Sequence, residues 1–92
     1  MPQLSVLLPY HNAEDTLEEC LESVCVQGME DFELLAVNDR STDASRCLVR
    51  SWSQRDARVR DLGCEGKGLV AALNTGLRRA GAPVIVRMDA DD

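Results

Sequence analysis

Short apolar runs alternate with segments whose apolar residues recur at helical spacing, and this alternation limits the folds open to the chain. Strands are predicted over residues 4–8, 32–37, 59–62 and 84–88. Helices are predicted between Asn12 and Gly28, over residues 44–55, and between Leu69 and Gly81. Because parallel neighbours need a connection of helix length, the order β-α-β-α-β-α-β predicts a parallel sheet with right-handed crossovers. We therefore expect a single α/β domain over residues 1–92, with a three-layer α/β/α, Rossmann-like architecture.

The predicted strand ends bring three polar clusters to one edge of the sheet. If the chain winds outward from its first strand, the strand order is 3-2-1-4, and the winding reverses between strands one and four. The carboxyl ends of strands one, two and four then face one crevice; they carry residues 9–12, Asn38 with Asp39, and residues 89–92. Pro9 is expected to stop the first strand, and Asn12 to cap the helix after it. The convergence predicts a ligand site without identifying the ligand.

Three carboxylates, those of Asp89, Asp91 and Asp92, follow the last strand within four positions. Carboxylates this close repel one another unless a cation or hydrogen-bond donors offset the charge. Mg²⁺ prefers such oxygen ligands and commonly shares them with the phosphates of a substrate. The same residues also suit a hydrated acidic loop or a helix cap, so at this point both a metal site and a hydrated loop remain open.

Composition argues against several classes of partner. The formal net charge is −6 and no basic stripe is visible, which argues against nucleic acid as the main partner. No apolar segment approaches the ~20 residues needed to span a membrane, and no secretory signal precedes the first strand. The chain has four cysteines, Cys20, Cys25, Cys47 and Cys64, and they form no CxxC pair. We interpret them as the reduced thiols of a cytoplasmic protein.

The loops exclude two phosphate-binding motifs and leave the roles of single residues open. No GxxxxGK[ST] loop is present, and the glycine-rich residues 63–68 neither match GxGxxG nor follow the first strand. Asp39 can accept hydrogen bonds from a base or ribose, or from its own turn. His11 can stack on a base or stay hydrated, and Lys67 can reach a phosphate or stay hydrated.

Several stretches, taken in order, carry a resemblance to a known family. They are SVLLPYHN (5–12), LEECLESV (17–24) with Gln27, VNDRSTD (37–43), Gly68 with ALNTG (72–76), and RMDADD (87–92). With them the chain resembles the donor-binding half of a family 2 glycosyltransferase of the GT-A fold. Each stretch alone is weakly specific, but the ordered set covers nearly the whole chain.

The resemblance implies a nucleoside-diphosphate sugar donor, usually a UDP-sugar, and a divalent cation, Mg²⁺ or Mn²⁺. By position, it implies donor contacts from Pro9, His11, Asn12, Asp39, Lys67, Gly68 and Asp89. Residues 89–91 match the DxD motif of the family, in which Asp91 would ligate the metal and Asp89 would contact ribose or the metal's water. Ser41 and Asn74 are expected to hold loops.

The chain departs from the family pattern at two loop positions. Arg40 stands where the family usually has Gly, so the loop after the second strand is expected to adopt another turn. Gly66 stands where the family often has Asn, which weakens any polar contact expected from that loop.

The chain also ends at the DxD motif. The resemblance implies an inverting transfer with a carboxylate base that deprotonates the acceptor. In the family this base lies later in the sequence, so we expect it beyond Asp92. We expect residues 1–92 to be a truncated domain that binds a nucleotide weakly without turnover. We also expect it either to self-associate through the bare strand edge at residues 84–88 or to have a partly disordered C-terminus.

The pattern of acids at strand ends also suggests two alternatives to a donor site. A non-catalytic α/β binding or interaction domain fits the same pattern. A receiver domain also places acids at strand ends, but it needs an aspartate at the end of the third strand, where this chain has Leu62 and Gly63.

Overall fold

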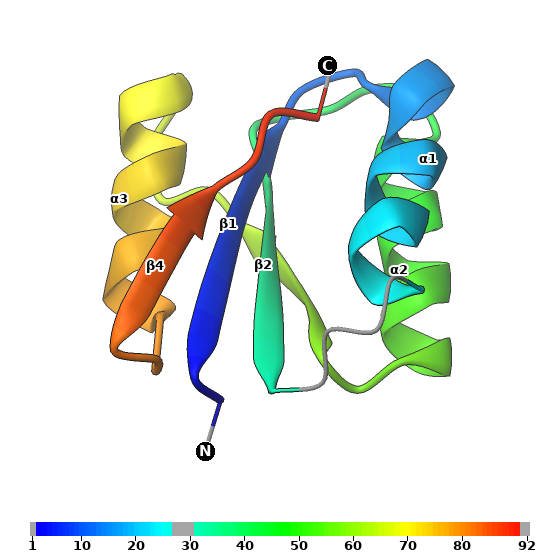
Figure 1. The fold of residues 1–92 in the computed structure, drawn as a ribbon. Helices are drawn as coiled ribbons and strands as arrows, with labels where there is room; N and C mark the ends of the chain where they lie inside the picture. The colour runs from blue at the N-terminus through cyan, green and yellow to red at the C-terminus, as the bar shows by residue number, and fades with distance from the viewer. Residues whose placement is uncertain (1, 27–30, 91–92) are drawn as a thin grey trace.

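The computed structural model describes residues 2–26 and 31–90 and contains four parallel strands separated by three helices (Figure 1). The elements are β1 (Leu4–Tyr10), α1 (Glu14–Cys25), β2 (Phe32–Asn38), α2 (Ser45–Arg55), β3 (Val59–Gly63), α3 (Leu69–Arg79) and β4 (Val84–Arg87). The strands lie in the order β3-β2-β1-β4, and every neighbouring pair is parallel. Both the predicted element order and the predicted strand order are confirmed.

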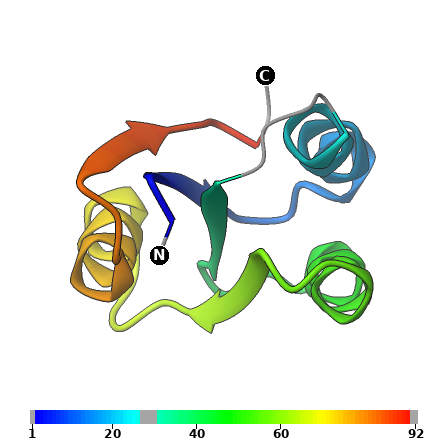
Figure 2. The same ribbon diagram turned by 60° about the horizontal axis from the view of Figure 1, so that its bottom comes forward.

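The sheet is covered on both faces, with α1 and α2 on one side and α3 on the other (Figures 1 and 2). Successive side chains of a strand point to opposite faces, so β1 contributes to two packing layers. Val6 and Leu8 belong to the core cluster shared with α1 and α2. Leu7 faces α3, where its Cδ2 atom lies 3.0 Å from the position that a Cβ atom on Gly76 would occupy. The three-layer architecture is therefore confirmed, and Gly76 lets α3 approach the sheet closely.

β1 differs from the prediction because it continues through Pro9 to Tyr10. Tyr10 O accepts a hydrogen bond from Asp39 N on the β2 side, whereas Leu7 O accepts one from Met88 N on the β4 side. Backbone groups of alternate residues point to alternate neighbours, so the missing N–H of Pro9 falls on the β4 side. Pro9 therefore leaves the pairing with β2 intact and removes the donor that would extend the pairing with β4, which ends at Arg87.

Glu33 is a nearly buried carboxylate that ties together the amino-terminal ends of the strands. One of its oxygens, Oε2, accepts hydrogen bonds from Ser5 Oγ and Gly81 N, both at 2.6 Å. Oε1 accepts one from Arg60 Nη1 at 3.3 Å. Burial raises the pKa of Glu33, but these hydrogen bonds outweigh burial and hold the pKa below its ordinary value.

Gly81, the predicted boundary of the third helix, contributes to the anchoring of β4 instead. α3 ends at Arg79, and its C-cap residue Ala80 is already extended. Gly81 does not close the helix; its N–H anchors the connection to β4 on Glu33.

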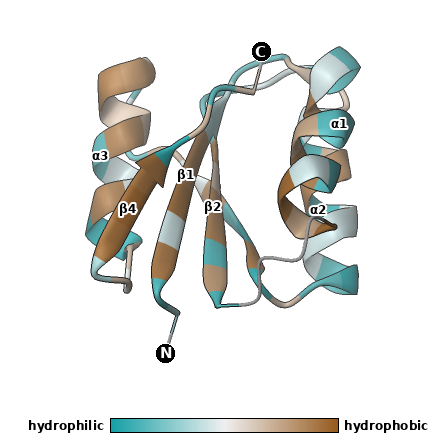
Figure 3. Cartoon of the chain, in the orientation of Figure 1, coloured by the Kyte–Doolittle hydropathy of each residue, from teal (hydrophilic) through white to brown (hydrophobic). Residues whose placement is uncertain are grey.

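β4 is the exposed edge of the described sheet. Its side chains are exposed along the whole strand, with Val84 at 54%, and Ile85 and Val86 each at 44% exposure. Figure 3 shows the strand as almost entirely hydrophobic. No helix of the described residues is long and apolar enough to cross a membrane.

We predict that Glu33→Gln lowers the free energy of unfolding by about 2 kcal/mol. The amide keeps the shape of the side chain but loses the negative charge that strengthens its three hydrogen bonds. The folded-state pKa of Glu33 is depressed, so its stabilisation is present above the ordinary glutamate pKa and is lost as the pH falls through the lower native pKa. Urea unfolding between pH 7 and pH 3 measures both effects. Glu65→Gln, at an exposed ion pair with Arg78, is the control and should change stability little. Equal stability of Glu33→Gln and the parent chain at pH 7 would contradict the prediction.

Candidate functional site

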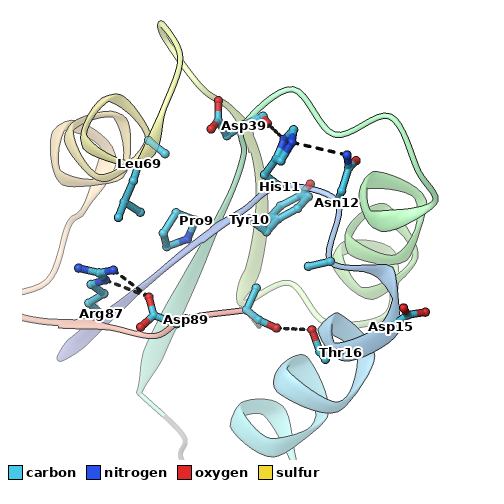
Figure 4. Close-up of a pocket in the computed structure, with 13 residues that line it drawn as sticks. Pro9, Tyr10, His11, Asn12, Asp15, Thr16, Asp39, Leu69, Arg87 and Asp89 are labelled. Atoms are coloured by element: carbon cyan, nitrogen blue, oxygen red, sulfur yellow. Dashed lines mark hydrogen bonds and ion pairs between the residues drawn. The ribbon is translucent and has the colours of Figure 1, made fainter. Parts of the chain in front are cut away.

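A pocket of about 680 Å³ opens where β1 and β4 part, at the carboxyl ends of the strands. It is lined by the end of β1 and the loop after it, the first turn of α1, the end of β2, α3, and the segment around the end of β4 (Figure 4). The lining residues are Pro9, Tyr10, His11, Asn12, Ala13, Asp15, Thr16, Asp39, Leu69, Ala72, Arg87, Asp89 and Ala90. The predicted crevice at the reversal of winding is therefore present.

The pocket contains most of the residues that the sequence places in a donor site. Pro9, His11, Asn12, Asp39 and Asp89 all line it. Gly68 is not a lining residue, but its N–H donates to the carboxylate of Asp39. Lys67 is likewise absent from the lining and is exposed.

Of the acids predicted to bind a metal, one lies at the pocket. Asp89 lines the pocket, whereas Asp91 and Asp92 lie outside the described residues. Within residues 2–26 and 31–90, no group of three or more His, Cys, Asp or Glu side chains is arranged to hold a cation. The predicted metal ligands Asp89 and Asp91 therefore stay a prediction.

Asp39 is a buried carboxylate at the end of β2 with two donors already in place. Oδ1 accepts hydrogen bonds from Arg40 Nε at 3.0 Å and Gly68 N at 3.1 Å, and Oδ2 lies 3.2 Å from the same Gly68 N. The hydrogen bond from Arg40 lowers the pKa of Asp39 most; burial opposes it, and Gly68 N–H and the His11 ring add to the lowering. Asp39 is therefore an ionised acceptor at neutral pH, and its Oδ2 keeps room for a further donor.

His11 is fixed by the backbone of the neighbouring loop. Its Nδ1 lies 2.6 Å from Asp39 O, and a carbonyl oxygen can only accept, so Nδ1 carries the proton. In the neutral ring Nε2 is then an acceptor, and Asn12 Nδ2 lies 3.5 Å from it. Although exposed, His11 is a positioned ring at the pocket and not a freely hydrated side chain.

Asn12 joins two loops, and its predicted role as a helix cap is wrong. The N-cap of α1 is Ala13, whose own side chain makes no capping hydrogen bond. The backbone of Asn12 has φ +49°, a left-handed conformation that Asn tolerates better than most residues. Its N–H donates to Ser41 Oγ at 3.0 Å, and its Oδ1 accepts from Thr42 N at 2.7 Å. Ser41 therefore holds a loop, as predicted.

A second set of bonds joins the starts of α1 and α2. Asp43 Oδ1 accepts from Ser45 N at 2.9 Å, and its Oδ2 accepts from Glu14 N at 3.2 Å. Ser45 Oγ accepts from Ala13 N at 2.8 Å. The loop that carries His11 is thus fastened to the loop that follows Asp39.

The segment after β4 crosses toward α1 and forms the other wall of the pocket. Thr16 Oγ1 donates to Ala90 O at 2.5 Å, and Arg87 Nε and Nη2 lie 3.1 and 3.0 Å from Asp89 Oδ1. Neither Thr16 nor Arg87 was predicted as a site residue from the sequence. The alternation of a strand offered a signal for Arg87, because residues two apart share a face and Asp89 was already a candidate.

The sequence matches the family model described as glycosyl transferase family 2 over residues 5–92. The chain belongs to this family. It is 36% identical over 92 residues to the uncharacterized glycosyltransferase EpsJ of Bacillus subtilis (strain 168), a match that covers 100% of this chain and 27% of that protein.

Two solved structures of glycosyltransferases are similar to this family 2 chain. The mannosyltransferase PcManGT from Pyrobaculum calidifontis, in complex with GDP-Man and Mn²⁺, gives a TM-score of 0.84 at 30% identity and covers 98% of this chain and 28% of its own. S. aureus TarS 1–349, in complex with UDP, gives a TM-score of 0.88 at 26% identity, and the match covers 99% of this chain and 28% of the TarS chain. The shared fold is the GT-A fold. The chain spans little more than a quarter of the length of these three relatives.

We predict that Asn12→Ala lowers the free energy of unfolding by about 1 kcal/mol, because it removes the acceptor of Thr42 N and places Ala in a left-handed conformation. Asn12→Asp keeps an oxygen acceptor and should lose less. Asn74, which was expected from the sequence to hold a loop, lies instead at an exposed position inside α3; Asn74→Ala is therefore the control and should cause no loss. Chemical unfolding at pH 7 measures all three variants, and a larger loss for Asn74→Ala than for Asn12→Ala would contradict the loop-joining role of Asn12.

Proposed function

We propose that this domain binds the donor of a glycosyl transfer, a nucleoside-diphosphate sugar, with the aid of Mg²⁺ or Mn²⁺. A UDP-sugar is the donor we favour. One observation carries the proposal: the pocket at the reversal of winding is lined together by the ionised carboxylate of Asp39, the fixed ring of His11 and the carboxylate of Asp89. Open α/β sheets bind nucleotides at this position. The relatives PcManGT and TarS, which share the fold, are in complex with GDP-Man and UDP.

In this proposal the end of β2 recognises the nucleoside. Oδ2 of Asp39 accepts a hydrogen bond from an N–H of the base, since its other oxygen is already held by Arg40 and Gly68. His11 offers a ring face and Pro9 an apolar contact beside the base. Asn12 acts through the loops that it joins, and Lys67 contributes a positive charge near the phosphates.

The acids after β4 serve the diphosphate. Mg²⁺ and Mn²⁺ prefer carboxylate oxygens as ligands, so the side chains of Asp89 and Asp91 are chemically suited to bind either cation. A cation bound there would act as a Lewis acid on the leaving diphosphate. Arg87 holds one oxygen of Asp89 and keeps that side chain at the pocket wall.

The transfer itself needs groups that the pocket does not supply. We propose an inverting reaction whose carboxylate base and acceptor site belong to parts of the relatives that this chain does not match. Residues 1–92 are then a donor-binding domain that does not turn over alone. We further propose that the domain works in the cytoplasm with reduced cysteines; Cys25, Cys47 and Cys64 form no disulfide within the described residues.

We predict that the domain binds UDP only weakly without metal and at least about tenfold more tightly with Mn²⁺, because the cation offsets the charge of the acids and the diphosphate. Asp91→Ala should remove the dependence on metal. Asp39→Asn should weaken UDP binding about tenfold while the metal dependence is kept. Titration calorimetry measures these effects, with Asp31→Ala, at the opposite end of the sheet, as the control. Equal affinity with and without Mn²⁺ would favour the alternative, a non-catalytic binding domain.

We also predict that the domain self-associates through the edge of β4, where Val84, Ile85 and Val86 are exposed. A second copy can add its own β4 edge to the sheet. Light scattering after size exclusion should show a mass that rises with concentration, and Ile85→Lys should reduce it. Val26→Lys changes an exposed apolar residue that is not on an edge strand, and it should have no effect. A clean monomer at high concentration would contradict the prediction.

A further inference from the structure

Arg40 has a backbone conformation that its residue type disfavours. Its φ is +57°, in the left-handed region where a side chain with a Cβ atom is strained. Asn12 is the other described non-glycine residue with positive φ, but its side chain hydrogen-bonds the neighbouring loop in compensation. The backbone at residue 40 would be less strained with glycine. A compensating interaction is therefore expected among the contacts of the arginine side chain.

The side chain of Arg40 points back to Asp39 and holds one of its oxygens. Arg40 Nε donates to Asp39 Oδ1 at 3.0 Å, although 58% of the arginine side chain is exposed. On the same carboxylate, Gly68 N donates from the loop between β3 and α3. The carboxylate is therefore held from two loops, and the main-chain oxygen of Asp39 is bonded by His11 from a third.

We infer that Arg40 is a positioning residue for donor recognition: it holds Oδ1 of Asp39 so that Oδ2 stays available in the pocket for an N–H group of the base. This inference rests on the proposed function. A planar guanidinium fixes a carboxylate in direction as well as in charge. Strain that persists at a binding site is consistent with a role in binding, because glycine at this position would relieve the strain but could not hold Asp39.

The charges around Asp39 support the same role. Arg40 acts on it from its own loop and His11 from the loop after β1, and Gly68 contributes an N–H dipole from the loop after β3. Arg40 contributes the largest lowering of the pKa of Asp39. Without Arg40, the carboxylate should take up a proton at higher pH and should sample more than one side-chain rotamer.

The test compares Arg40→Gly with Arg40→Ala. Both remove the contact to Asp39, but only glycine relieves the left-handed backbone. We expect both variants to bind uridine about tenfold more weakly than the parent chain. We expect Arg40→Gly to melt about 4 °C above Arg40→Ala. Uridine is the probe because it carries no phosphate and needs no metal; guanosine replaces it if guanine is the base that the parent chain binds. Arg50→Ala is the control. Arg50 is about as exposed as Arg40 and pairs with Asp61 outside the pocket, so this substitution should leave binding unchanged.

A second measurement separates positioning from a general loss of structure. Uridine binding should fall on the acid side as Asp39 takes up its proton, and this fall should move to higher pH in both Arg40 variants. A loss of fold would lower affinity at every pH without moving the midpoint.

The outcomes distinguish the inference from the proposed function. If the parent chain binds neither nucleoside, nor UDP with Mn²⁺, the proposed function fails and the inference fails with it. If the parent chain binds and Arg40→Gly binds with equal affinity and the same acid midpoint, the inference alone is overturned.

Discussion

The parting of β1 from β4 is the feature on which the site depends. β1 pairs with β2 from Leu4 to Tyr10, but it pairs with β4 only from Leu4 to Leu7. Pro9 has no N–H to offer on the β4 side, so the two strands separate while β1 continues beside β2. The pocket fills this separation, and the loops after β1 and β2 stand side by side above it.

Hydrogen bonds between these loops hold them together as one wall of the pocket. Asn12, Ser41 and Asp43 join the first two loops, and Gly68 N brings the third loop to Asp39. Most of these bonds connect residues about thirty positions apart in sequence, such as Asn12 with Thr42. A pocket built in this way relies on hydrogen bonds between loops more than on the helices behind them. Single polar substitutions can therefore disturb the pocket while the sheet stays intact.

The sequence was sufficient for the layers and the strand order, because alternating periodicity and the handedness of crossovers leave few arrangements. It was also sufficient to bring Pro9, His11, Asn12, Asp39 and Asp89 to one edge. It misassigned Asn12, since a contact with a distant loop leaves no local pattern, and it ended β1 too early. A proline breaks a strand only where its N–H is needed, and that depends on which neighbour is present. Thr16 was missed for a similar reason, because its partner Ala90 lies far along the chain. Asp91 lies outside the described residues, so its role as a metal ligand stays a prediction.

The two ends of the sheet differ in role: hydrogen bonds to Glu33 hold the amino-terminal end together, and the pocket lies at the carboxyl end. Glu33, Ser5 and Arg60 fasten the amino-terminal end, far along the strands from Asp39 and Asp89. The loops around the pocket can therefore change in sequence while the carboxylate of Glu33 still anchors the opposite end of the sheet. Under the proposed function, residues 9–13, 39–44 and 64–68 form one unit that can be exchanged between relatives to alter donor choice, with the amino-terminal ends of the strands kept in common.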